Sequence, residues 1–142
     1  MTDDIELLKE CDSGVKMGID GIKGVIDNAF DDGLKGILEN YEEEHIKILN
    51  VIGEKLKKSG MDVKEPHPIA KMNLKFVTDI KMAMNDSDKK IANIMMDGCN
   101  MGIKSVSMYM NQYAGASKET KDIANSIVTL EQNFMNDLRK YL

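Results

Sequence analysis

The sequence contains no tryptophan, only four tyrosines and three phenylalanines, and just two prolines and two cysteines. It has no stretch in which valine or threonine alternates with polar residues, so we predict no β-strand. No apolar run approaches the roughly 18 residues that a membrane-spanning helix needs, and the N-terminus is acidic rather than basic. We therefore expect no transmembrane span, no secretory signal and no membrane partner.

A basic surface is also missing. The formal net charge is −5 at pH 7 and the lysines form no basic stripe, so we expect no nucleic-acid partner. The two cysteines, Cys11 and Cys99, are far apart, and each lies within a helical pattern. Because disulfides are rare in the cytosol, reduced thiols in a cytoplasmic protein are the simplest interpretation.

Residues that favour helices, such as lysine, leucine, glutamate and the twelve methionines, are plentiful. Apolar residues recur three and four positions apart over long stretches, which predicts amphipathic helices. The 142 residues are enough for a single domain, residues 1–142, with a substantial core. We predict four long helices and one shorter helix: residues 4–28, 32–58, 88–113, from the cap at Ser117 to Tyr141, and the shorter one over residues 68–84.

The connections between these helices indicate a topology. Short connectors near residues 28–33 and 114–117 predict two helical hairpins. A connection of about thirty residues, which contains both prolines, joins the hairpins, and this is the connectivity of ferritin-like bundles. We therefore predict an all-α, antiparallel four-helix bundle with ferritin-like connectivity and a short extra helix in the long crossover.

One of the two histidines lies at the centre of an apolar helical stripe. The stripe has alternating spacings of four and three residues: Leu34, Leu38, Tyr41, His45, Ile48 and Ile52. Glu42 precedes His45 by three residues, about 60° away around the helix, and could reach the same point in space. Asp12 interrupts the apolar stripe of the first helix in a similar way. A buried acid is costly unless it is paired, protonated or bound to a metal ion.

A di-metal site in this architecture needs a carboxylate from the first and third helices and a Glu-x-x-His pair from the second and fourth. Candidates for part of this set are present: Asp12 (with Glu10 as a weaker alternative), Glu42, His45 and Glu131. Cys99 and Phe134 stand where the remaining ligands would be. The candidate metal ligands are therefore Asp12, Glu42, His45 and Glu131, enough for one iron, manganese or zinc ion.

Several motifs resemble a known superfamily. They are Asp12-Ser13-Gly14 followed by Gly18, the stretch Tyr41–His45, and residues 65–84. Together with the order of the helices they resemble the ferritin-like superfamily, most closely a bacterial family of uncharacterised ferritin-like proteins. The resemblance covers nearly the whole chain and implies a carboxylate-bridged di-iron or di-manganese centre that reacts with oxygen or peroxide. The incomplete ligand set of this sequence departs from that pattern.

Two functional hypotheses follow. The leading one is a metal-degenerate, non-catalytic bundle that acts as a binding or structural protein. His45 would then form a buried hydrogen-bonded pair with Asp12 or Glu42 that fixes the register of the helices. The alternative is a metal-binding protein, linked to redox chemistry or metal handling, that holds one iron, manganese or zinc ion.

Glycines recur along the first helix: Gly14, Gly18, Gly21 and Gly24. Each costs up to about 1 kcal/mol of helix propensity relative to alanine. Such a run suits a helix that another backbone approaches closely. The approaching backbone belongs either to another helix of the same chain or to a second copy in a homodimer.

Overall fold

The computed structural model describes residues 2–60 and 87–142, and this part of the chain is helical and contains no strand. It forms four long helices: α1 (Thr2–Val25), α2 (Asp32–Lys58), α4 (Asp88–Gln112) and α5 (Lys118–Leu138). Short 3-10 turns, η1 (Ile26–Asn28) and η4 (Arg139–Tyr141), follow α1 and α5. The all-α, four-helix prediction is thus confirmed for the described residues. The short helix predicted over residues 68–84 lies outside them.

The helices begin and end close to the predicted residues because their caps are local. Asp31, Ser87 and Ser117 precede α2, α4 and α5, and each side chain accepts a hydrogen bond from a backbone N–H of the first turn. Three lysines lie in the last turn of α2, where they complement the helix dipole. The first predicted helix differs slightly, since its last residues tighten into the 3-10 turn η1.

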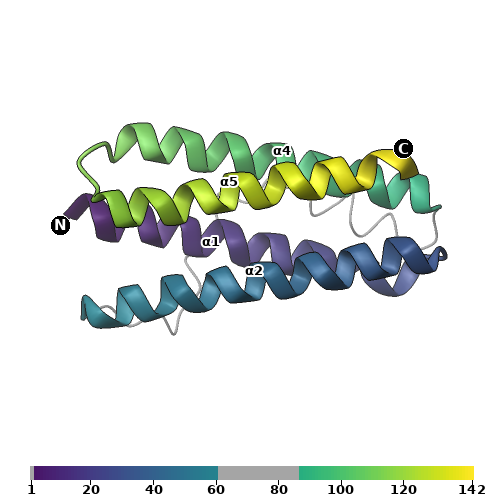
Figure 1. Cartoon of the computed structure of the whole chain (residues 1–142), viewed down its shortest axis with the longest axis horizontal. Coiled ribbons are helices and arrows are strands. Elements are labelled where there is room, and N and C mark those ends of the chain that lie inside the picture. Colours follow the sequence, from purple (N-terminus) through teal and green to yellow (C-terminus); the bar gives the residue numbers. More distant parts are fainter. Residues whose placement is uncertain (1, 61–86) are drawn as a thin grey trace.

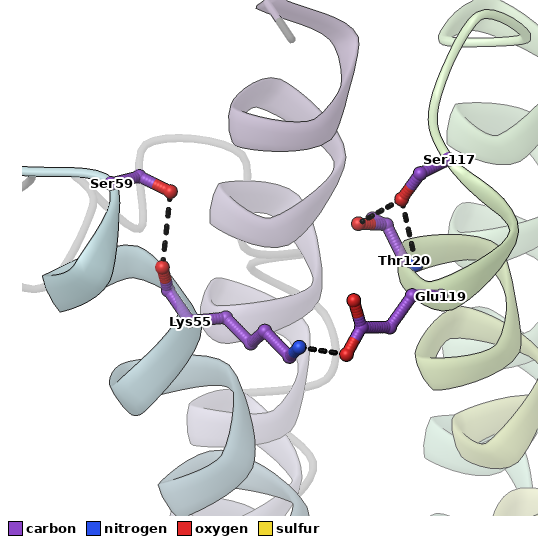
Figure 2. A network of polar contacts seen from close by, with 5 residues as sticks. All are labelled: Lys55, Ser59, Ser117, Glu119 and Thr120. Atoms are coloured by element: carbon purple, nitrogen blue, oxygen red, sulfur yellow. Dashed lines mark hydrogen bonds and ion pairs between the residues drawn. The ribbon is translucent and has the colours of Figure 1, made fainter.

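In the bundle, α1 packs against α2 and α4, and α5 packs against the same two helices (Figure 1). Contacts at the ends fix the direction of each helix. Lys55 near the end of α2 forms an ion pair with Glu119 at the start of α5 (Figure 2). At the opposite end, the Tyr141 hydroxyl donates to Asp31. Asp88 at the start of α4 contacts Phe30 at this second end. Consequently α2 ends at one end of the bundle and α4 begins at the other.

Acidic residues at the starts of α1 and α4 hold the two turns of the bundle. Asp88 of α4 accepts hydrogen bonds from the backbone N–H groups of Phe30 (2.8 Å) and Asp31 (2.9 Å). At the other end, Asp4 of α1 accepts from the Ser117 N–H at 2.7 Å. Hydrogen bonds from the Thr120 side chain and the Ser117 backbone lower the pKa of Asp4 to about 2. These acids therefore join one hairpin to the other.

The core consists of two apolar clusters, one toward each end of the bundle. The cluster near the α1–α2 turn includes Ile22, Leu34, Leu38, Ile91 and Leu138. The cluster near the α4–α5 turn includes Leu7, Leu8, Val15, Ile52 and Leu56. Among the described residues, no helix is long and apolar enough to cross a membrane. Between the two clusters lies a layer of polar side chains.

Replacing Asp88 by alanine should lower the free energy of unfolding by about 1–2 kcal/mol, because two backbone N–H groups lose their acceptor. Urea denaturation measures this change. Asp97→Ala is the matched control, since Asp97 is an exposed aspartate of the same helix. The control should change stability by no more than about 0.5 kcal/mol. Equal effects of the two substitutions would contradict the role given to Asp88.

Candidate functional site

Four polar side chains are buried among the described residues: Asp12, His45, Thr120 and Glu131. Three of them are candidate metal ligands from the sequence, and Thr120 belongs to the first turn of α5. Only 1% of His45 and 8% of Glu131 is exposed. Burial of charged side chains at this level requires partners, which the neighbouring helices supply.

His45 lies in the middle of α2, and both of its ring nitrogens make hydrogen bonds. Nδ1 lies 2.5 Å from the backbone carbonyl of Tyr41, one helical turn earlier. A carbonyl oxygen only accepts, so Nδ1 carries a proton and donates it. Nε2 lies 2.5 Å from Oε1 of Glu131, which comes from α5 on the other hairpin. The imidazole therefore connects the backbone of α2 to a side chain of α5.

The environment favours the charged form of this histidine. Burial, the largest single effect, lowers the pKa of His45, but the hydrogen bond and charge of Glu131 and the Tyr41 carbonyl together outweigh it. The pKa of His45 is therefore raised above the ordinary value for histidine. An imidazolium that donates to a carboxylate is the state that satisfies both side chains.

Glu131 has a second polar neighbour, the thiol of Cys99 on α4. Burial raises the pKa of the Cys99 thiol, and the charge of Glu131 and a hydrogen bond to it raise this pKa further. The sulfur is therefore a protonated donor to the carboxylate. A protonated thiol is neither a nucleophile nor a metal ligand.

Two glycines lie beside the pair, and the one on α1 allows close approach to it. A Cβ atom placed on Gly18 of α1 would lie 3.0 Å from Cδ2 and 3.1 Å from Nε2 of His45. A Cβ atom on Gly102 of α4 would lie 3.6 Å from Cγ of Glu131. The imidazole thus packs against the backbone of α1, and the glutamate side chain against that of α4. Gly18 accordingly serves packing within the chain, one of the two roles expected for the glycines of this helix.

Aromatic rings cover the pair on one side. Phe134, which follows Glu131 by three residues, meets the His45 ring edge-on at a centroid distance of 6.3 Å. Tyr41 stacks on Phe134 at 4.4 Å, and its hydroxyl donates to Asp137 at 2.6 Å. Burial and Asp137 raise the pKa of the Tyr41 phenol. These rings exclude water from the histidine side of the pair.

The other two candidate ligands lie apart from this pair. Asp12 is buried on α1, and its carboxylate forms an ion pair with Lys16 at 2.7 Å, one turn along the same helix. Glu42 is half-buried on α2. The expected partner of His45 was Asp12 or Glu42, and this was wrong, because Glu131 and the Tyr41 carbonyl occupy the two ring nitrogens.

The pair has the geometry of a hydrogen bond rather than of metal ligation. Two ligands of one ion, each about 2.0–2.2 Å from it, lie roughly 3 Å or more apart. The contact between His45 and Glu131 is shorter, at 2.5 Å. Within residues 2–60 and 87–142, no three histidine, cysteine, aspartate or glutamate residues are grouped so that they could hold a metal ion. The metal role of the four candidates stays a prediction.

Sequence reasoning identified His45 and Glu131 but missed the groups that support them. These are the Tyr41 carbonyl, Gly18 and Gly102. Their signals were present, since Tyr41 precedes His45 by one helical turn and Gly102 follows Cys99 by three residues on one stripe. Which glycine faces which side chain depends on the packing between helices.

No protein-family model, curated protein or solved structure matches this chain. Its function therefore has to be inferred from its own fold and side chains.

Replacing Glu131 by glutamine should lower the free energy of unfolding at pH 6 by on the order of 1–3 kcal/mol, because a buried charge loses its partner. A raised histidine pKa contributes stability that is fully present below the ordinary value of 6.5 and is lost as the pH rises through the raised value. The difference between the parent and Glu131→Gln should therefore shrink from pH 6 to pH 9.

Urea denaturation of both proteins at the two pH values measures this change. His67, the other histidine, is present in both proteins, so its titration cancels in the comparison. A difference that stays constant across the range would contradict the charged state assigned to His45.

Proposed function

We propose that this protein is a metal-degenerate, ferritin-like bundle that acts as a non-catalytic binding or structural protein in the cytoplasm. The observation that carries the proposal is the direct hydrogen bond between His45 and Glu131, which fills the middle of the bundle. A ferritin-like bundle would hold its metal centre at this level, between the four helices. Here a proton would take the place of the ion.

The order and direction of the helices support the ferritin-like part of the proposal. The helices form two hairpins, and α2 ends at the opposite end of the bundle from the start of α4 (Figure 1). A bundle with one long crossover between two hairpins has this arrangement.

The state of the polar groups in the core supports a non-catalytic role. Asp12 is paired with Lys16, and Glu131 is shared between His45 and the thiol of Cys99. The raised pKa values of Cys99 and Tyr41 keep both groups protonated, so they supply no nucleophile near neutral pH. These four groups therefore all have partners within the chain.

One observation favours the alternative, a protein that binds iron, manganese or zinc. A histidine that ligates a metal almost always donates its other ring N–H to a carbonyl or carboxylate. His45 does this, since Nδ1 donates to the Tyr41 carbonyl while Nε2 points toward Glu131. If the two side chains moved apart, Nε2 and the carboxylate would be the first ligands of an ion.

Elemental analysis of protein purified without chelator separates the two functions. We expect far less than one equivalent of iron, manganese or zinc, both before and after incubation with each metal. His45→Ala should contain the same amount as the parent, and Glu43→Ala, at an exposed neighbouring position, is the control. One ion per chain in the parent and in Glu43→Ala, lost in His45→Ala and in Glu131→Gln, would establish the metal-binding function instead.

A second copy of the chain is the partner that we propose for the outer face of α1. Gly14 is exposed on this face, and a Cβ atom there would meet no other atom within 4 Å. The low helix propensity of Gly14 is therefore not offset by close packing among the described residues. Close contact with another copy would give this glycine a role.

Light scattering at high micromolar concentration tests the homodimer. We expect a dimer for the parent and a shift toward monomer for Gly14→Lys, because a long charged side chain would separate the two backbones. Gly36→Lys on α2 is the matched control, since Gly36 is also helical, exposed and without neighbours within 4 Å. A monomeric parent at this concentration would rule out the dimer.

A further inference from the structure

The two hairpins, α1–α2 and α4–α5, are equivalent halves of the bundle. Residues of α4 correspond to residues of α1 at one constant spacing in the sequence, and residues of α5 to those of α2 at another. Buried residues match under this correspondence, as in the pairs Leu7 and Ile91, Ile22 and Val106, and Ile52 and Leu138. An approximate two-fold axis across the bundle thus relates one hairpin to the other.

The polar contacts obey the same correspondence. Asp4 at the start of α1 accepts from the Ser117 N–H, and Asp88 at the start of α4 accepts from the Asp31 N–H. Ser117 and Asp31 are equivalent residues, the N-caps of α5 and α2. Both ends of the bundle are therefore built in the same way.

The same correspondence relates the residues in the middle of the bundle. Gly18 of α1 faces His45 of α2 as Gly102 of α4 faces Glu131 of α5. His45 and Glu131 are equivalent residues that meet across the approximate axis. They differ from each other in chemistry, whereas the glycines that face them correspond.

Because of this symmetry, either hairpin could in principle pair with the same hairpin of a second copy of the chain. The hairpin α1–α2 presents much the same apolar pattern and end acceptors as α4–α5. In a pair of like hairpins, Asp4 could accept from Asp31 of the second copy, as Asp88 does from Asp31 within the chain. Neither the acids at the ends nor the matched apolar residues exclude such a pair.

The centre of the bundle penalises such a pair. Like pairing would place His45 opposite the second copy's His45, and Glu131 opposite its Glu131. Each Nδ1 donates to its own Tyr41 carbonyl, so two neutral imidazoles would place two acceptors face to face, and two charged ones would repel. Two imidazoles that share one proton would keep a buried positive charge without a counter-ion. Two buried carboxylates would repel as well, and a pair that shared one proton would keep a buried negative charge without a counter-ion. In the unlike pair a single proton satisfies both side chains.

We propose that the His45–Glu131 pair makes the pairing of the hairpins specific: it favours α1–α2 on α4–α5 and penalises either hairpin on a second copy of itself. This goes beyond setting the register of helices, and it does not depend on the function proposed above. A buried polar residue can select a pairing at some cost in stability, and here a complementary pair would do so.

Exchange of the two residues tests their equivalence. His45→Glu alone places two carboxylates at the centre, Glu131→His alone places two imidazoles there, and each should lower the melting temperature. The double variant His45→Glu/Glu131→His should recover most of the loss and refold to the species that the parent forms. A double variant no more stable than the worse single variant, or one that fails to fold, would overturn the proposal.

Removal of both polar groups tests whether the pair favours unlike over like hairpins. His45→Leu/Glu131→Leu should remain folded but, after refolding at rising protein concentration, give a growing fraction of larger species by size exclusion with light scattering. The control is Asp12→Leu/Lys16→Leu, which removes a pair that lies within one helix and cannot distinguish between hairpins. The control should refold as the parent does. If the first double variant forms only the parent's species at every concentration, the proposal is wrong.

Discussion

The hydrogen bond between Nε2 of His45 and Oε1 of Glu131 joins the two hairpins at the centre of the bundle, where almost no water reaches either side chain. A charged pair at such a depth is stable only if every remaining donor and acceptor has a partner, because the loss of hydration is large. The Tyr41 carbonyl and the Cys99 thiol supply those partners. This one contact thereby restricts how residues in the middle of the four helices can pack.

The contact between His45 and Glu131 also explains the position of a glycine on α1. A methyl group on Gly18 would press against the imidazole, so α1 has a glycine at the level where α2 has its histidine. On either side of this layer the core returns to leucine, isoleucine and valine. The apolar clusters supply most of the burial, and the polar layer determines which surfaces meet.

A metal site and a protonated pair can be built from the same residue types, although their chemistry differs. Asp12, Glu42, His45 and Glu131 are residue types that iron or manganese would use. In this fold, Lys16 pairs with Asp12, and Nε2 of His45 lies within hydrogen-bond distance of Glu131. Phe134 and Cys99 complete the surroundings of the pair.

Much of the fold could be predicted from local patterns. The bounds of α2 and the caps at Ser87 and Ser117 follow from residues close together in the chain, since helix ends are satisfied locally. Burial of Asp12 and His45 also follows from their places on apolar stripes. The partner of His45 was predicted wrongly, because the prediction favoured acids on its own hairpin over one from α5.

By itself, the sequence determined the helices, their buried faces and the polar residues that those faces carry, because each depends on spacing along one helix. Only the tertiary structure decided that His45 meets Glu131 and that Gly18 and Gly102 lie beside them. These features depend on the rotation and level at which separate helices pack. The 3.6-residue repeat of a helix does not set its rotation or level relative to its neighbours. Contacts between residues far apart in the sequence set both.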